Sequence, residues 1–192
     1  MTLTGINQLW VADITYIRMR TEFVVLAVVI DRYSRKAIGW ALDRSLSSQV
    51  AVNALQQAIR QRQPPPGVVH HSDQGVQYAS SDYAAVLEAH RLIASMSRPA
   101  NPYDNAACES FMKTLKQEEI YCSQYANFDE LSQHLEVFIS TYYNRQRLHS
   151  ALGYRTPEEF ERDAATTPAA DRQHDAAAMQ FFLSPSIAKG NP

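Results

Sequence analysis

Cysteine is scarce in this 192-residue sequence, and its scarcity excludes two common ways of stabilising a small fold. Cys108 and Cys122 are the two cysteines, too few for a disulfide framework and without the paired spacing of a zinc site. Hydrophobic residues make up 45% of the chain, which is enough for a packed core. We therefore expect one globular domain in a reducing compartment.

Long hydrophobic runs are also missing. The longest, Phe23 to Ile30, has eight residues, whereas a membrane-spanning helix needs about 20. The stretch Met1 to Gly5 lacks the basic and apolar regions of a signal peptide. These absences predict a cytoplasmic protein with no membrane partner.

A strong net charge is the third absence, because the formal charge is only −2 at pH 7. The charge is uneven, however. Residues 1–63 contain eight Lys/Arg and four Asp/Glu, whereas residues 64–120 and 121–163 each contain four and seven. The basic first third allows a local phosphate-binding face but does not require one.

The hydrophobic pattern predicts alternating strands and helices. Three strands joined by short turns come first, typical of an antiparallel meander. A helix capped by Ser47 or Ser48 follows, and Pro64 to Gly67 ends it. The order continues as strand, helix, strand, helix, with two further helices later. The expected strands are 9–17, 23–30, 35–42, 68–71 and 91–96, and the later helices begin near Ser80, Tyr103, Asn127 and Thr156.

Two acidic residues occupy unusual positions in this pattern. Asp13 shares a strand face with Val11 and Ile17, where an ionised carboxylate is costly unless it is paired or binds a cation. It is either a hydrogen-bonded core acid or a metal ligand. Asp73 follows the strand 68–71, at the strand end where open α/β sheets bind ligands. A turn aspartate can also be purely local.

The helix after residue 103 has two distinct faces. Cys108, Phe111, Met112 and Leu115 follow the spacing i, i+3, i+4, i+7 of a buried stripe. A neighbouring polar face is formed by Asn105, Glu109, Lys113 and Lys116. On an arbitrary helix this would be a solvated face with Glu–Lys pairs. Asp13 and Asp73 favour a functional interpretation instead.

With thirty-five residues between Asp73 and Glu109, the chain resembles the DDE recombinases, and more narrowly the insertion-sequence transposases encoded by a second reading frame. Any one acid is weak evidence, but three in this order with these flanks are specific. The resemblance covers about residues 7–161. The matching stretches are Trp10–Ile17, His70–Tyr78, Ser95–Arg98, Asp104–Phe111 and Tyr143–Tyr154.

The resemblance implies an α/β, ribonuclease-H-like fold with a mixed five-stranded sheet in the order β-β-β-α-β-α-β-α, as in retroviral integrases. It also implies metal-dependent nicking and strand transfer of DNA by a catalytic triad of Asp13, Asp73 and Glu109. Two Mg²⁺ or Mn²⁺ ions about 4 Å apart can clamp the attacking and leaving oxygens. Mg²⁺ prefers carboxylate oxygens, so Asp13 would bridge both ions while Asp73 and Glu109 each complete one site.

Several polar residues gain a DNA-binding interpretation from the same resemblance. Lys113 and Lys116 project beside Glu109 and are expected to contact DNA, and Asn105 either contacts DNA or supports the site. Arg145 and Arg147 match a family segment where phosphate contact and a structural role are equally open. His70 and His71 fit packing beside the turn better than metal binding. Cys108 belongs to the apolar stripe, so we expect a core residue rather than a nucleophile.

Family members carry about a hundred residues with helix-turn-helix segments before this core, and the sequence lacks them. We expect a catalytic core with C-terminal helices at residues 1–163 and a disordered tail at 164–192. The expected partners are DNA, further copies of the chain when two ends synapse, and a first-reading-frame protein. One alternative is a truncated, inactive remnant that binds DNA or full-length transposase as a regulator. Another is a ribonuclease H, which fits the flanking motifs poorly.

Overall fold

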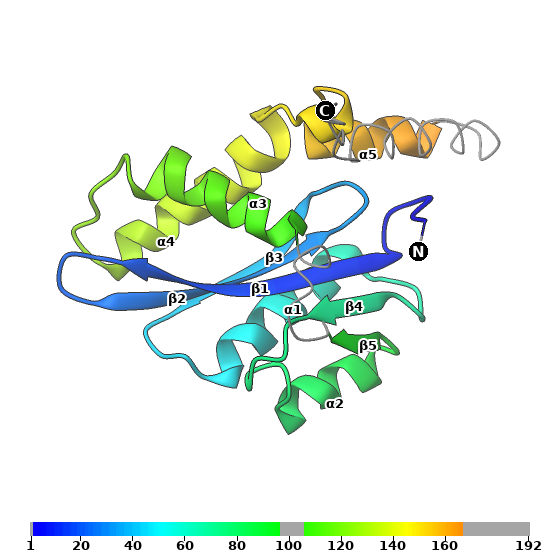
Figure 1. Cartoon of the computed structure of the whole chain (residues 1–192), viewed down its shortest axis with the longest axis horizontal. Helices are drawn as coiled ribbons and strands as arrows, with labels where there is room; N and C mark the ends of the chain where they lie inside the picture. The colour runs from blue at the N-terminus through cyan, green and yellow to red at the C-terminus, as the bar shows by residue number, and fades with distance from the viewer. Residues whose placement is uncertain (1, 97–105, 167–192) are drawn as a thin grey trace, which may run out of the picture.

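The computed structural model describes residues 2–96 and 106–166, which form a three-layer α/β fold around one sheet (Figure 1). The strand order in the sheet is β3-β2-β1-β4-β5. The first three strands pair antiparallel, and β4 and β5 run parallel to β1. The predicted mixed five-stranded sheet and its opening meander are confirmed. The strands are β1 Leu9–Arg18, β2 Phe23–Asp31, β3 Ala37–Asp43, β4 Val69–Ser72 and β5 Ile93–Met96.

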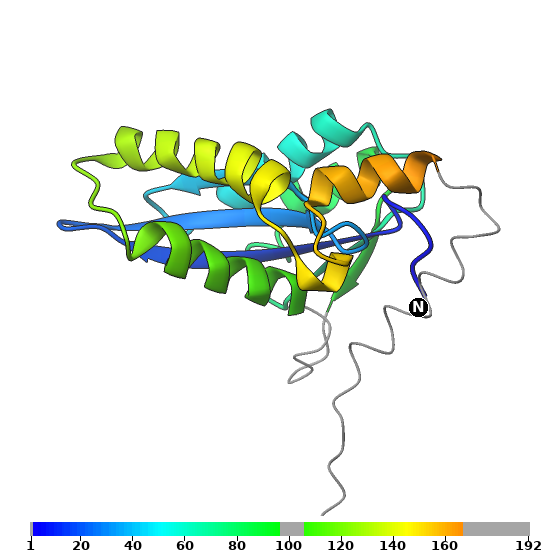
Figure 2. The same cartoon turned by 90° about the horizontal axis from the view of Figure 1, so that it is seen from above.

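The helices cover both faces of the sheet. In Figure 1, α3 and the rod formed by α4 and η2 lie above the sheet, whereas α1 and α2 lie below it. The view from above in Figure 2 shows α3 and this rod lying over the strands. The rods α3–η1 and α4–η2 each begin as α-helix and continue as π-helix. The helical elements are α1 Ser48–Arg62, α2 Ser81–Ala89, α3 Ala106–Leu115, η1 Lys116–Ile120, α4 Phe128–Glu136, η2 Val137–Gln146, the 3₁₀ turn η3 Ser150–Leu152 and α5 Pro157–Thr166.

Alternate residues of the central strands supply two separate cores. Val11 and Ile17 of β1 pack under α3, whereas Trp10 and Ala12 pack against α1 and α2. Strand β2 is buried on both faces from Val24 to Asp31, as its continuous apolar run predicts. The two faces of β1 therefore belong to different layers, and Asp13 belongs to the layer of α3.

Side-chain caps fix several helix starts. Ser80 and Asn127 accept hydrogen bonds from backbone N–H groups of α2 and α4. Thr156 and Glu159 form a reciprocal capping box at the predicted helix start, with bonds of 3.0 and 3.2 Å. Ser47 precedes α1 without a side-chain cap. These local signals explain why the helix starts could be predicted from sequence.

The third strand begins later than its hydrophobic pattern predicts. Arg35 and Lys36 belong to the turn before β3, which starts at Ala37. Arg35 has a left-handed backbone, with φ of 59°, so it cannot continue an extended strand. The Asp31 carboxylate also accepts hydrogen bonds from the N–H groups of Tyr33 and Ser34 and so stabilises the turn.

The C-terminal helix α5 extends through Thr166, three residues past the expected end of the core. The remainder of the expected tail, including residues 181–183, lies outside the described residues. Among the helices of residues 2–96 and 106–166, none combines the length and apolarity needed to cross a membrane.

Candidate active site

Asp13 lies within β1, opposite Val28 of β2, on the face covered by α3. Its neighbours two and four residues away on that face, Val11 and Ile17, are fully buried. Asp13 itself is half-buried, and its Oδ1 accepts a 2.8 Å hydrogen bond from the N–H of Ile14. A carboxylate therefore interrupts an otherwise apolar strand face.

Asp73 follows β4 at the level of Asp13. In the parallel pairing of β1 with β4, Val11 lies opposite His71. Asp13 comes two residues after Val11, and Asp73 comes two residues after His71, just past the end of β4. The strand register therefore places both acids at the same level of the sheet. Asp73 is exposed, and its Oδ1 accepts a 2.9 Å hydrogen bond from the N–H of Gly75. The turn keeps its carboxylate at the sheet edge.

Glu109 reaches the same region from α3, which packs over β1 and β2 (Figure 1). The predicted stripe Cys108, Phe111, Met112 and Leu115 is buried against the sheet, as its spacing requires. Glu109 and Lys113 are exposed, and Lys116 is partly buried at the start of η1. The apolar stripe thus holds the polar face of α3 along the margin of the sheet.

The electrostatics of Asp13 link these residues. Burial, the largest effect, together with the negative charges of Asp73 and Glu109, raises the pKa of Asp13 to about 6. The hydrogen bond from Ile14 and the positive charge of Lys116 act in the opposite direction. The fold therefore brings Asp73, Glu109 and Lys116 close enough to Asp13 to act on its charge.

These donors fit a hard divalent cation. Carboxylate oxygens are the ligands that Mg²⁺ prefers, and the adjacent thiol of Cys108 is fully buried with its pKa raised by burial. Among residues 2–96 and 106–166, no three His, Cys, Asp or Glu side chains lie close enough together, as they are oriented in this structure, to hold a metal ion. Asp13 and Asp73 instead bond to neighbouring N–H groups. Binding an ion would require these side chains to turn towards one another.

The predicted DNA contacts differ in their surroundings. Lys113 is exposed beside Glu109 and makes no ion pair with the described part of the chain. Asn105 lies outside the described residues. Arg145 pairs with Glu158 at 2.9 Å, and Arg147 makes two-pronged hydrogen bonds to Glu118 at 2.9 to 3.2 Å. A phosphate contact by either arginine would exchange an existing ion pair.

The two histidines of β4 are packed, as predicted. Nε2 of His70 is hydrogen-bonded to the hydroxyl of Tyr83, and Nδ1 of His71 lies 3.0 Å from Oγ of Ser95. Burial, reinforced by the neighbouring His71, lowers the pKa of His70 to about 4. His70 is therefore neutral at physiological pH. Its hydrogen bond connects the strand before Asp73 to α2.

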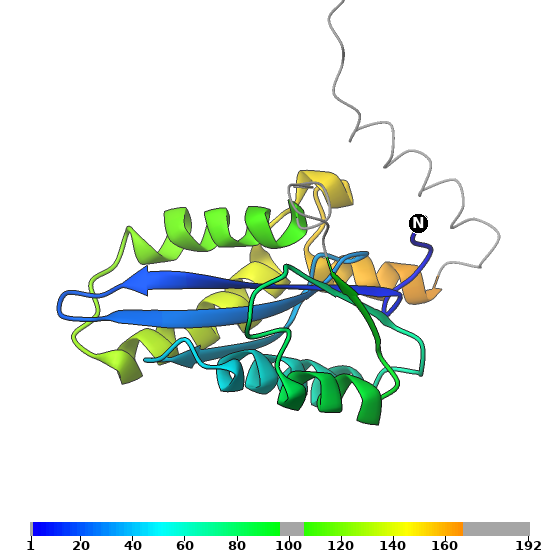
Figure 3. The ribbon, with the colours of Figure 1, turned by 60° about the horizontal axis from the view of Figure 1, so that its bottom comes forward.

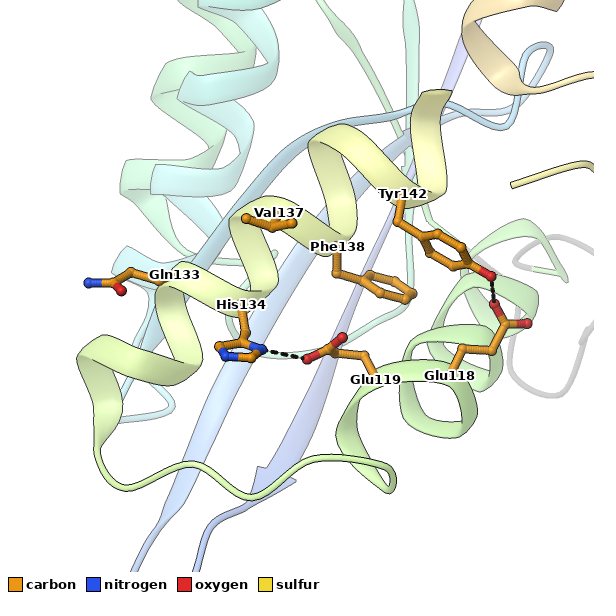
Figure 4. A pocket seen from close by; sticks show the side chains of 7 residues that line it. All are labelled: Glu118, Glu119, Gln133, His134, Val137, Phe138 and Tyr142. Atoms are coloured by element: carbon orange, nitrogen blue, oxygen red, sulfur yellow. Dashed lines mark hydrogen bonds and ion pairs between the residues drawn. The ribbon is translucent and has the colours of Figure 1, made fainter. Parts of the chain in front are cut away.

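A separate groove of about 440 Å³ lies between η1 and the rod α4–η2 (Figure 4). His134 contacts Glu119 there at 3.1 Å, and the hydroxyl of Tyr142 donates a 2.9 Å hydrogen bond to Glu118. None of the three predicted triad carboxylates lines this groove. Its polar groups already pair with one another, so it is not part of the candidate active site.

Sequence patterns did not single out Arg32 and Arg35. Both lie in the turn between β2 and β3, half-buried, although arginine in a surface turn is normally solvated. The available signal was their position: two cations flanking a tight turn directly after the most buried strand. Their role depends on tertiary contacts, which the sequence does not reveal.

Comparisons with known proteins agree with this fold. The integrase core domain models match residues 4–102 and 90–157. A transposase for insertion sequence element IS904 from Lactococcus lactis is 42% identical, over 83% of this chain and 63% of its own length. Transposase InsF for insertion sequence IS3A from Escherichia coli is also 42% identical, over 82% of this chain and 55% of its own length. The chain thus spans little more than half the length of these relatives.

Solved structures show the same core at low sequence identity. The intasome of simian T-cell lymphotropic virus matches with a TM-score of 0.70 and 20% identity, covering 88% of this chain and 59% of that one. The HTLV-2 integrase catalytic core, solved in complex with magnesium, matches with a TM-score of 0.61 and 15% identity over 82% and 97%. The ribonuclease-H-like fold expected from the sequence is confirmed.

Proposed function

Because the chain belongs to the integrase core domain family, we propose that it is the catalytic core of an insertion-sequence transposase that nicks DNA at element ends and joins the 3′-hydroxyls to new phosphodiesters. One observation carries this proposal: Asp73 and Glu109, from two other elements, lie close enough to Asp13 for their charges to raise its pKa. The 42% identity to named insertion-sequence transposases supports it further.

The role that we propose for each residue follows from the chemistry of its side chain. Asp13, between the other two acids, is the proposed shared ligand, and Asp73 and Glu109 are the ligands of one ion each. Two bound Mg²⁺ or Mn²⁺ ions would activate the attacking hydroxyl and stabilise the leaving oxygen. Lys113 and Lys116 would hold the phosphate backbone against Glu109, since they are cations on the same helical rod. No side chain of this site has to act as a general base.

Substitution of each carboxylate tests the proposal. Asp13→Asn, Asp73→Asn and Glu109→Gln remove one anionic ligand while keeping side-chain size, so Mg²⁺-dependent nicking and strand transfer should fall by about 100-fold or more. Nicking would be followed on labelled DNA that carries the element ends, with Mg²⁺ or Mn²⁺. Asp82→Asn and Glu88→Gln are matched controls, because both acids are exposed on α2. Full activity in any triad variant would refute the assignment.

A regulatory role is the second candidate function. Such a protein would bind element ends, or a full-length transposase, without cutting DNA. The same assay separates the two functions when binding is measured beside nicking. DNA binding with no metal-dependent cleavage would favour the regulator. Assembly with further copies, and with a first-reading-frame protein, belongs to either proposal.

A further inference from the structure

The turn between β2 and β3 is held on two sides. The N–H of Ala37 donates to the side-chain oxygen of Asn144 at 3.0 Å, and the Asn144 amide donates back to the Ala37 carbonyl at 2.9 Å. Ser34 and Lys36 bond to Glu161 of α5 at 2.6 and 3.3 Å. Figure 3 shows this turn beside α5 and the segment that leads to it from η2. Its position is therefore fixed by η2 and α5.

The charged residues of this turn fall into two classes. Asp31 and Lys36 have partners of opposite charge, Arg62 at 3.9 Å and Glu161 at 3.3 Å respectively. The guanidinium groups of Arg32 and Arg35 form no hydrogen bond or ion pair with the part of the chain that the structure describes. Both are half-buried, and burial lowers the pKa of each. Partly desolvated cations without an anion are costly, so the arrangement suits an anion from outside.

Arg32 is on the same side of the sheet as Asp13. Its N–H donates to the carbonyl of Leu9, continuing the antiparallel pairing in which Trp10 lies opposite Asp31. Leu9 and Asp13 share a strand face, so Arg32 shares it too. Four residues separate Leu9 from Asp13, which is about 13 Å along the strand. Arg32 is thus a few nucleotides from the proposed scissile phosphate.

Arg32 and Arg35 belong to the same tight turn, three residues apart. Arg35 is close enough to Arg32 to disfavour the charged form of Arg32. The two arginines therefore form one cationic site.

We propose that Arg32 and Arg35 form a phosphate-binding site that holds the DNA backbone next to the triad, an inference that rests on the proposed function. A guanidinium can donate two parallel hydrogen bonds to one phosphate, and the fixed turn spares much of the cost of ordering these groups. Arg145 and Arg147 differ because acidic partners already occupy them.

The test is DNA binding in EDTA, measured by fluorescence anisotropy of a labelled duplex across a series of salt concentrations. Arg32→Gln and Arg35→Gln should each reduce the slope of log affinity against log salt by about 0.9, and the double variant by about 1.8. Arg32→Lys and Arg35→Lys should keep most of the slope. Arg20→Gln is the matched control, because Arg20 is exposed in the hairpin at the opposite end of β2. It should leave the slope unchanged.

Three results would overturn the inference. The first is a wild-type slope in the double glutamine variant, or no DNA binding by the wild-type protein. The second is an equal loss in Arg20→Gln, which would indicate only net charge. The third is a lower melting temperature in the glutamine variants, because a structural role predicts it and an unpaired cation does not. Since the assay needs no metal or cleavage, failure of nicking would refute the proposed function while leaving this site intact.

Discussion

Two groups of charged residues in this molecule differ in whether they have partners of opposite charge. Near α5, Glu161 accepts hydrogen bonds from Ser34, Lys36 and both terminal nitrogens of Arg62, and it is nearly buried. At the margin of the sheet, Asp13 has acidic neighbours in Asp73 and Glu109. The first group is neutralised within the fold, whereas in the second the charge of Lys116 does not outweigh burial and the two acids. Paired buried charges have a structural role here, and the acidic group fits the cation-binding role that we propose for it.

The difference appears in the pKa values. Burial acts to raise the pKa of Glu161, but the hydrogen bonds and charge of Arg62 outweigh it, so the pKa is lower than usual. Asp13 is also desolvated, yet its largest compensating contact is a single backbone N–H, and its pKa rises. Similar burial thus gives opposite shifts because the partners differ.

Among the changes to these two groups, loss of the Glu161 carboxylate should have the largest effect on the free energy of unfolding. Glu161→Gln leaves Lys36 without its anion and Arg62 with the more distant Asp31 at 3.9 Å. Removal of one partner from a buried pair costs about 3 to 5 kcal/mol. Urea unfolding should show this loss as a lower midpoint. Glu158→Gln is the matched control on the same helix, since its pair with Arg145 is exposed and is worth less than about 1 kcal/mol. Equal effects of the two substitutions would contradict the comparison.

A second prediction concerns pH. The pKa of His70 is about 4 in the folded protein, against an ordinary value of 6.5, so the unfolded chain takes up the proton first as pH falls. The contribution of His70 to stability should therefore fall by about 3 kcal/mol as the pH drops from 6.5 to 4. Glu161 has a lowered pKa, so its contribution is present above pH 4.5 and is lost only below it.

Urea midpoints measured across this pH range would separate the two groups. His70→Asn should reduce the slope between pH 6.5 and pH 4 but not remove it, because burial also lowers the pKa of His149 to about 4. His90→Asn, at an exposed position after α2, should keep the wild-type profile. If His70→Asn kept the full wild-type slope, the buried neutral histidine would not be the cause.

Much of the fold could be predicted because its signals are local. Alternation of apolar residues predicted the strands, Pro64 to Gly67 predicted the end of α1, and Thr156 with Glu159 predicted the start of α5. The order of the three acids and the resemblance around them led to the candidate site. Their assignment as metal ligands remains a prediction, as does DNA contact by Asn105, Lys113, Lys116, Arg145 and Arg147.

The pairing of charges could not be predicted, because it joins residues far apart in the sequence. Glu161 and Arg62 are 99 positions apart, and Arg147 and Glu118 are 29 apart. The sequence left phosphate contact and a structural role equally open for Arg147, and η1 supplies an acidic partner for it. Arg32 and Arg35 were not singled out from the sequence, and they have no ion-pair partner among residues 2–96 and 106–166. Which cation is available to DNA is a property of the tertiary structure.

The smallest expected effect is that of Asp13 in the candidate site on the stability of the protein. Because the folded-state pKa of Asp13 is raised to about 6, its ionised form destabilises the metal-free protein at pH 8, and this cost disappears below the ordinary value of 3.8. Asp13→Asn should therefore increase the free energy of unfolding in EDTA at pH 8 by about 1 to 2 kcal/mol. Added Mg²⁺ at about 100 times its Kd should stabilise the wild-type protein by roughly 2.7 kcal/mol and the variant much less. Thermal and urea unfolding with and without Mg²⁺ would measure both effects. A less stable metal-free variant would mean that Asp13 is a structural acid like Glu161, and the distinction between the two groups of charges would fail.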